Sequence, residues 1–191
     1  MKKVIRIFRS HEAAEKSDRE FYKRLSSQER LDMLLTLIAR NQEAIPDATR
    51  TGLKRVYRVL NNNEVRYLVV GAHAVAFHGR PRYTADIDFF VDSSPENAER
   101  ITKALDQFGL GDIGVDSADF TVADLVVQLG VEPNRVDIMT SISGVSFEEA
   151  WDTRADGELD GLPVQFISKD LLKRNKASVG RKQDLADLDY L

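Results

Sequence analysis

Two aspartates stand one residue apart in an otherwise apolar stretch of the chain. Asp86 and Asp88 alternate with Ile87, Phe89 and Val91 in the segment DIDFFV. Side chains i and i+2 of a β-strand point to the same face, so a strand here would project both carboxylates together and turn the apolar residues into the core. Two like charges so close repel each other unless a cation lies between them or one carboxylate is protonated. Oxygen ligands favour Mg²⁺ or Mn²⁺ over zinc, so we expect one of these ions here.

A third aspartate has the same kind of surroundings. Asp137 lies between Val136 and Ile138 in the segment RVDIMT. If this segment is a strand beside the first one, three carboxylates converge on one patch. Such a patch can hold two divalent ions, which activate an attacking oxygen and neutralise a leaving phosphate. The alternative for each single aspartate is a turn or cap residue, and an Asp-x-Asp pair alone is weak evidence for a metal.

A glycine precedes the aspartates at a change of pattern. The segment YLVVG (67–71) predicts a buried strand, and AHAVAFHG (72–79) predicts a short helix. Gly71 would therefore end the strand and begin the helix. Backbone N–H groups at the start of a helix are free to bind an anion, and the helix dipole favours negative charge there. We expect this turn to meet a phosphate.

The rest of the chain alternates helical and strand patterns. Ser10 is expected to cap a helix that runs to about residue 25. Ser26 and Glu29 match a capping box before a strongly apolar helix. Further helices are predicted near residues 49–62 and 95–109 and after Ser168, and strands near residues 3–8, 67–71, 86–91, 124–130 and 135–142. From Tyr67 onwards the pattern is that of an α/β protein.

A break at Pro46 and Asp47 divides the chain into two expected parts. Residues 1–46 would form a basic N-terminal strand and helical segment, and residues 47–191 the main domain with its C-terminal helices. Residues 1–60 contain 14 Lys and Arg and 8 Asp and Glu, a balance of +6, whereas residues 61–191 contain 13 and 23, a balance of −10. The basic front could bind a polyanion or pack on the acidic body, or it could simply be a solvated helical surface.

Composition narrows the class of protein. Hydrophobic residues make up 42% and charged residues 30% of the 191, as in ordinary globular proteins. No apolar run is long enough to span a bilayer, and the first residues lack the sustained apolar region of a signal peptide. The chain has no cysteine, which excludes disulfides and thiolate metal sites. We expect a cytoplasmic protein with no membrane partner.

Taken in order, these motifs resemble the signature of the nucleotidyltransferase superfamily that includes DNA polymerase β. That signature is a strand, a Gly-Ser or Gly-Gly turn, a short helix, an Asp-x-Asp strand and a later single Asp. Here it reads VVGAHAVAFHGRPRYTADIDFFV and then NRVDIMT. The resemblance implies an α/β (α+β) nucleotidyltransferase fold, with a short mixed β-sheet flanked by helices and an additional N-terminal helical segment.

The chain is more similar still to small bacterial nucleotidyltransferases of the AbiEii-like kind, several of which act as toxins in toxin–antitoxin pairs. Those proteins carry Arg-x-Thr-x-Asp-x-Asp, matched by Arg82 and Thr84 before the two aspartates. They also carry a late Lys followed by Arg-x-x-Asp-x-x-Asp, matched by Lys176, Arg181, Asp184 and Asp187. The resemblance covers about residues 65–191. One position departs from the superfamily, because Ala72 replaces the usual Ser or Gly and offers only its backbone N–H.

The resemblance implies a role for each matched residue. Asp86, Asp88 and Asp137 would be the catalytic residues and the ligands of Mg²⁺ or Mn²⁺, with Asp137 near the acceptor hydroxyl. Gly71 and Ala72 would position the triphosphate of an NTP, and Lys176 would reach its β- and γ-phosphates. Arg82, Thr84 and Asp184 complete the expected nucleotide-binding set. Asp184 and Asp187 could support Lys176 or contact the base or ribose, or could be a solvated helix surface.

Two classes of function fit these residues. The first is an enzyme that transfers a nucleoside monophosphate from an NTP to a hydroxyl of RNA, for example tRNA, or of a protein, with a cognate antitoxin as a possible partner. The second is a nucleotidyltransferase-like binding protein that lacks catalysis and acts in a paired system. The three aspartates favour the enzyme, whereas Ala72 favours the second class slightly. A simple metal-dependent phosphohydrolase is disfavoured because no His-Asp metal motif is present.

Overall fold

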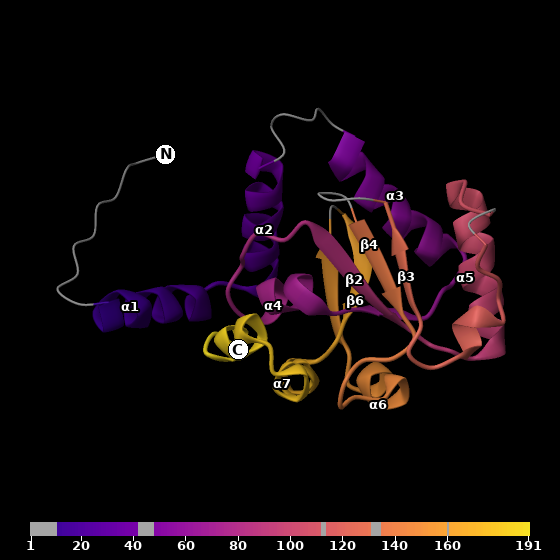
Figure 1. Ribbon diagram of the computed structural model, residues 1–191. Coiled ribbons are helices and arrows are strands. Elements are labelled where there is room, and N and C mark those ends of the chain that lie inside the picture. The colour runs from indigo at the N-terminus through magenta and orange to yellow at the C-terminus, as the bar shows by residue number, and fades with distance from the viewer. Residues whose placement is uncertain (1–10, 42–47, 112–113, 131–134, 160) are drawn as a thin grey trace.

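A mixed six-stranded β-sheet forms the centre of the computed structural model, which describes residues 11–41, 48–111, 114–130, 135–159 and 161–191 (Figure 1). The strands lie in the order β3–β4–β2–β1–β6–β5. Their bounds are β1 Tyr67–Val69, β2 Asp86–Val91, β3 Val126–Leu129, β4 Arg135–Met139, β5 Ala155–Leu159 and β6 Leu162–Phe166. The pairs β2–β4 and β1–β6 are parallel, and the other neighbours are antiparallel. The predicted α/β class with a mixed sheet flanked by helices is confirmed.

Helices cover both faces of the sheet (Figure 1). Their bounds are α1 His11–Arg24, α2 Ser27–Asn41, α3 Ala48–Asn62, α4 Gly71–His78, α5 Pro95–Phe108, α6 Phe147–Asp152, α7 Lys169–Val179 and α8 Lys182–Leu188. On one face, Tyr57 of α3 packs edge-on against Phe89, with ring centroids 5.4 Å apart. Leu105 of α5 and Ile138 of β4 line a small apolar space beside α3. The opposite face carries Asp86 and Asp88 and lies beside α4, α7 and α8.

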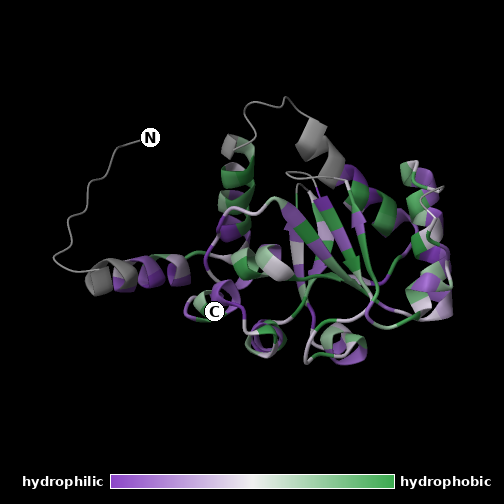
Figure 2. Cartoon of the chain, in the orientation of Figure 1, coloured by the Kyte–Doolittle hydropathy of each residue, from purple (hydrophilic) through white to green (hydrophobic). Residues whose placement is uncertain are grey.

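The capping box predicted before α2 is confirmed. The Ser26 backbone N–H donates to Glu29 Oε2 at 2.8 Å, and the Glu29 backbone N–H donates to Ser26 Oγ at 3.2 Å. The helix then buries Leu31 and Leu34 completely in the same core as the sheet. By contrast, α1 is mostly hydrophilic where its side chains are described (Figure 2). None of the described helices is long and apolar enough to cross a membrane.

The sequence patterns do not predict the β5–β6 hairpin or the short helix α6. Gly157 and Pro163 interrupt the alternation of apolar and polar residues that identifies a strand. Gly157 is required by packing, because a Cβ there would lie 2.8 Å from the stacked rings of Phe77 and Phe166. Ser168 occupies the N-cap position of α7, as expected, but its side chain makes no capping hydrogen bond. The strand predicted at residues 3–8 lies outside the described residues.

Candidate functional site

Three aspartates converge on one face of the sheet. Asp86 and Asp88 project together from β2, and the parallel pairing of β2 with β4 sets Asp137 directly beside Asp88. One carboxylate oxygen from each of the three lies within 4.8 Å of the others. This spacing suits a shared divalent cation, and carboxylate oxygens are the ligands that Mg²⁺ and Mn²⁺ prefer. The convergence expected if the two strands were neighbours is therefore observed, whereas the metal remains a prediction.

All nine residues predicted for catalysis or nucleotide binding line a single cleft of about 820 Å³. They come from the β1–α4 turn, the loop before β2, strands β2 and β4, and helices α7 and α8: Gly71, Ala72, Arg82, Thr84, Asp86, Asp88, Asp137, Lys176 and Asp184. A cleft of this size accommodates a ligand as large as a nucleotide. The structure thus brings the set together, although the role of each member stays a prediction.

Asp88 is the least compensated of the three carboxylates. Burial, together with the charges of Asp86 and Asp137, raises the pKa of Asp88 to about 6, although Arg135 and Lys176 oppose the shift. Within the described part of the chain, Asp88 forms no ion pair. A divalent ion at this position would remove the repulsion that causes the raised pKa.

Only glycine fits at position 71, because of its backbone conformation and its contact with Asp88. Its φ of +58° lies in the left-handed region, which favours glycine. A Cβ at this position would approach Asp88 Oδ2 to 1.8 Å, so no side chain fits without moving the carboxylate. The first turn of α4 therefore begins directly against the acidic face, with Ala72 5% exposed. A ligand that binds the aspartates through a cation can also reach the backbone N–H groups of this turn.

Arg135 neutralises part of the acidic cluster, a role that our sequence prediction missed. Its guanidinium donates to Asp86 Oδ2 at 2.5 Å and to Asp137 Oδ1 at 3.0 Å. No role in the site was expected for Arg135 from the sequence. The signal was present in the sequence, because Arg135 stands two residues before Asp137 and must project from the same face of the strand.

Two neutral side chains orient the outer carboxylates. Thr84 is 8% exposed, and its Oγ1 donates to Asp86 Oδ1 at 2.5 Å. Gln128 of β3 donates from Nε2 to Asp137 Oδ2 at 3.3 Å. The other oxygen of each carboxylate accepts a hydrogen bond from Arg135. The rotamers of Asp86 and Asp137 are therefore held from two sides, as a preorganised ligand set requires.

Lys176 lies at the edge of the cleft in a buried ion-pair network. It is 4% exposed, and its Nζ lies 2.7 Å from Asp184 Oδ1 and 2.9 Å from Asp187 Oδ2. Arg82 Nε lies 3.1 Å from Asp187 Oδ1. Although burial raises the pKa of Asp187, hydrogen bonds from Arg82 and Lys176 outweigh it and lower the pKa overall. Asp184 and Asp187 thus contact Lys176, in agreement with the supporting role considered for them.

Arg80, His73 and His78 do not line the cleft. Arg80 is 4.0 Å from Asp18 and lies over the ring of Tyr190. Burial lowers the pKa of His73 to about 4, so this imidazole is neutral at physiological pH. His78 donates from Nε2 to the backbone oxygen of Ile167 at 2.7 Å. Both histidines therefore contribute to the packing of α4.

Comparisons with known proteins do not assign the chain to a family. No protein-family model matches it, and no curated protein matches it. Among solved structures, the chain is similar to a Thermotoga maritima protein described as a "putative nucleotidyltransferase", with 20% sequence identity and a TM-score of 0.47. The likeness covers 72% of this chain and 88% of the other. It is too distant to carry an argument, so the function must be inferred from the site itself.

Proposed function

We propose that this protein is a metal-dependent nucleotidyltransferase that transfers a nucleoside monophosphate from an NTP to a hydroxyl acceptor on RNA or protein. The observation that carries the proposal is the convergence of Asp86, Asp88 and Asp137 within 4.8 Å, beside the Gly71 turn. The donor set fits Mg²⁺ or Mn²⁺, because it contains only oxygens and carries more negative charge than Arg135 can balance. When bound, the ion supplies charge neutralisation at the attacking and leaving oxygens.

Residues of the cleft would accept the proton, bind the phosphates and stabilise the leaving group. The acceptor oxygen attacks the α-phosphorus, and the bond from that phosphorus to the bridging oxygen of pyrophosphate breaks. The hydroxyl proton passes to Asp137, whose carboxylate lines the cleft and is 7% exposed. Backbone N–H groups at Gly71 and Ala72 bind the phosphates. Lys176 and Arg82 contribute positive charge at the cleft wall for the leaving pyrophosphate.

Label transfer from an α-labelled NTP tests this proposal. All four NTPs are offered with total RNA, tRNA and cell protein as acceptors, in MnCl₂ or MgCl₂. Transfer should require the metal and should fall by orders of magnitude in Asp86→Ala and Asp137→Ala. Asp106→Ala serves as the matched control, because Asp106 is an exposed residue of α5, which covers the opposite face of the sheet.

A different outcome would favour a binding protein without catalysis. Ala72 has no hydroxyl to hold a phosphate, and Lys176 is already paired with Asp184 and Asp187. Compared with a serine at this position, Ala72 lacks at most one neutral hydrogen bond, about 1 kcal/mol net, so we expect weaker NTP binding rather than loss of activity. If no label reaches any acceptor and the protein binds no nucleotide, the enzyme assignment is wrong.

The AbiEii-like resemblance extends the proposal to a cellular role. We propose that the transfer acts as the toxic activity of a toxin–antitoxin pair, with tRNA as the acceptor and a cognate antitoxin protein as the partner. Induced expression of the wild type in bacteria should then arrest growth, whereas the Asp86→Ala variant should not. Equal growth of both strains would remove the toxin role and leave the enzymatic proposal standing.

A further inference from the structure

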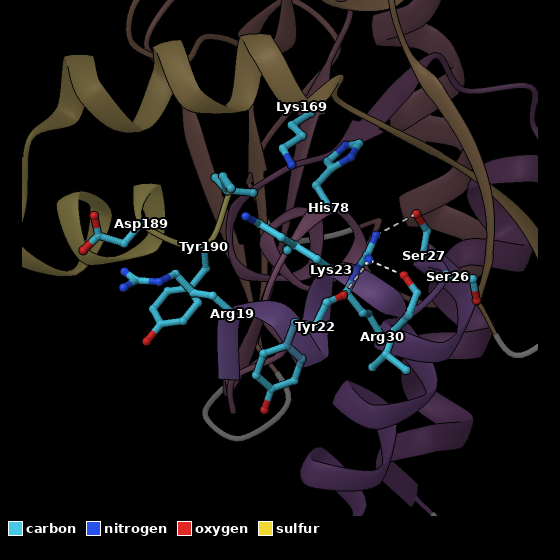
Figure 3. A pocket seen from close by; sticks show the side chains of 13 residues that line it. Arg19, Tyr22, Lys23, Ser26, Ser27, Arg30, His78, Lys169, Asp189 and Tyr190 are labelled. Carbon is cyan, nitrogen blue, oxygen red and sulfur yellow. Dashed lines mark hydrogen bonds between the residues drawn. The ribbon is translucent and has the colours of Figure 1, made fainter. Parts of the chain in front are cut away.

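A second hollow, of about 570 Å³, lies on the side of the molecule where α1 meets the body (Figure 3). It is bounded by residues from α1, the start of α2, the end of α4, the start of α7 and residues 189–191. These segments are far apart in the sequence and meet only in the folded chain. None of the residues that line this hollow, which we call the basic pocket, belongs to the nucleotide cleft.

Positive charge dominates the lining of the basic pocket. Arg19, Lys23, Arg30 and Lys169 line it, against one carboxylate side chain, that of Asp189. The side chains of Arg19, Lys23 and Lys169 form no hydrogen bond or ion pair with any residue that the structure describes. Figure 3 shows Lys23 and Lys169 extending into the same space from different helices. The lining therefore has more positive than negative side-chain charge, which favours binding of an anion.

Arg30 adds a buried charge with only neutral partners. Its side chain donates to the backbone oxygens of Phe77, Tyr22 and Leu25 and to Ser27 Oγ, with donor–acceptor distances from 2.5 to 3.2 Å. These bonds use all five N–H groups of the guanidinium. Arg30 is 8% exposed, and no carboxylate in the described chain lies within ion-pair distance of it. Its charge therefore remains to attract an anion to the pocket, although its donors are occupied.

The pKa of Lys169 reflects the positive charge around the basic pocket. Burial lowers the pKa of Lys169, and the positive charges of Lys173, Arg30 and Lys23 lower it further, while Asp170 opposes them. Cations that depress one another's pKa are each stabilised when an anion binds between them. These cations come from different helices, so only the fold brings their charges together.

Aromatic rings accompany the cations. Tyr22 and Tyr190 line the basic pocket, and Arg80 lies over both rings, at 5.8 Å and 4.6 Å from their centroids. Proteins that bind single-stranded nucleic acids combine a basic groove for the backbone with aromatic and arginine planes on which bases stack. A pocket for a free phosphate ion would need only the cations, so the tyrosines favour a nucleic acid strand.

The basic pocket and the cleft are joined by a shared helix. Helix α7 places Lys169 in the pocket and Lys176 in the cleft, seven residues later. At 1.5 Å per residue the two lysines are ~10 Å apart along the helix axis. One strand of nucleic acid advances about 3.4 Å per nucleotide, so about three nucleotides cover this distance.

We propose that the basic pocket binds backbone phosphates of a single-stranded RNA acceptor, whose terminal hydroxyl then reaches the three aspartates. This inference rests on the proposed function and names RNA as its acceptor class. Lys23, Lys169 and Arg19 contact backbone phosphates about three nucleotides from Lys176 at the edge of the cleft, and Tyr22 and Tyr190 stack on bases held in the pocket. The pocket sets which end of the RNA is presented to the cleft.

The test measures binding of a fluorescent 12-nucleotide (an arbitrary length, about four times the spanned distance) single-stranded RNA to the full chain. The assay is run in EDTA across a salt series, so that metal-bound phosphate in the cleft does not contribute. The Lys23→Gln/Lys169→Gln variant should weaken binding roughly tenfold and reduce the slope of log K against log salt by about 1.4, since each single-strand phosphate contact contributes about 0.7. Arg58→Gln/Lys103→Gln is the matched control, with two exposed cations removed from α3 and α5.

Three outcomes would overturn the proposal. Wild-type binding by the Lys23→Gln/Lys169→Gln variant, or equal weakening in the control variant, would show that RNA does not use this pocket. Calorimetry with inorganic pyrophosphate distinguishes the source of the phosphate: pyrophosphate binding that needs both lysines, without RNA binding, would mean a small-molecule site. Label transfer by the wild type is measured separately. If Lys23→Gln/Lys169→Gln loses RNA binding but the wild type transfers no label, the enzyme proposal is wrong and RNA binding by the pocket is still supported.

Discussion

At the scale of single residues, Asp88 controls how the acidic face responds to pH and metal. Its pKa is raised to about 6 in the folded chain by burial and by the neighbouring aspartates. An unfolded chain has an Asp pKa of about 4, so the folded protein binds more protons between pH 4 and 6. Its stability in the absence of metal should therefore fall as pH rises through this window. The full penalty, about 3 kcal/mol for a pKa raised by roughly two units, applies above pH 6.

We expect Mn²⁺ or Mg²⁺ to remove this penalty, because an ion that binds only the folded state stabilises it. The melting temperature should rise more on adding MnCl₂ at pH 7.5 than at pH 5, where protons compete for Asp88. The Asp88→Asn variant should melt higher than the wild type in EDTA at pH 7.5 and should lose the Mn²⁺ shift. Differential scanning fluorimetry measures both. Identical melting of the wild type in EDTA and in MnCl₂ would contradict the metal site.

Arg135 competes with any cation for the same carboxylates. It binds Asp86 and Asp137 in the structure, so a divalent ion must displace it or share the two oxygens with it. We predict that Arg135→Gln tightens Mn²⁺ binding about tenfold, which corresponds to ~1.4 kcal/mol of relieved repulsion between cations. The midpoint of a Mn²⁺ titration of the melting temperature measures this. An unchanged or higher midpoint would show that Arg135 does not oppose the ion.

At the scale of elements, an ion-pair network joins α7, α8 and the loop before β2. Lys176 pairs with Asp184 and Asp187, and Arg82 pairs with Asp187 as well. Removing the central cation would leave two largely buried carboxylates with one cation each, Arg82 for Asp187 and the exposed Arg181 for Asp184. Lys176→Ala should therefore destabilise the protein by about 3 kcal/mol, whereas Arg181→Ala, which removes an exposed cation 3.4 Å from Asp184, should cost under about 1 kcal/mol.

Chemical denaturation compares the two variants, and NTP titration adds a second readout. If Lys176 also binds phosphate, Lys176→Ala should raise the NTP concentration needed for half-maximal transfer, and Arg181→Ala should change it less. Equal denaturation midpoints for Lys176→Ala and wild type would contradict a structural role for the network.

At the scale of the whole molecule, α2 belongs to the packing of the main domain. Leu34 of α2 and Leu172 of α7 are both fully buried in one hydrophobic cluster. Leu34→Ala and Leu172→Ala should each lower the free energy of unfolding by about 3 kcal/mol. Calorimetry should show one transition in each case, because α2 and the sheet share a core. A separate, low-temperature transition for Leu34→Ala would instead support the domain boundary predicted near residue 46.

Local patterns in the sequence determined much of the fold and part of the site. Alternation in residues 86–91 identified β2 and the common direction of Asp86 and Asp88, because the strand period of two is a property of the backbone itself. The Ser26–Glu29 capping box marked the start of α2 for a similarly local reason. The β5–β6 hairpin was not predicted because the glycine at position 157 is required by contact with the stacked rings of Phe77 and Phe166. Phe77 is distant from Gly157 in the sequence, so no local pattern shows this contact.

Only the tertiary structure decided which charges meet. The parallel pairing of β2 and β4 set Asp137 beside Asp88, and the same pairing brought Arg135 onto Asp86. The basic pocket could not be foreseen either, because its cations come from α1, α2 and α7. Coulombic and ion-pair interactions depend on distances across the fold, which no local period of the sequence encodes.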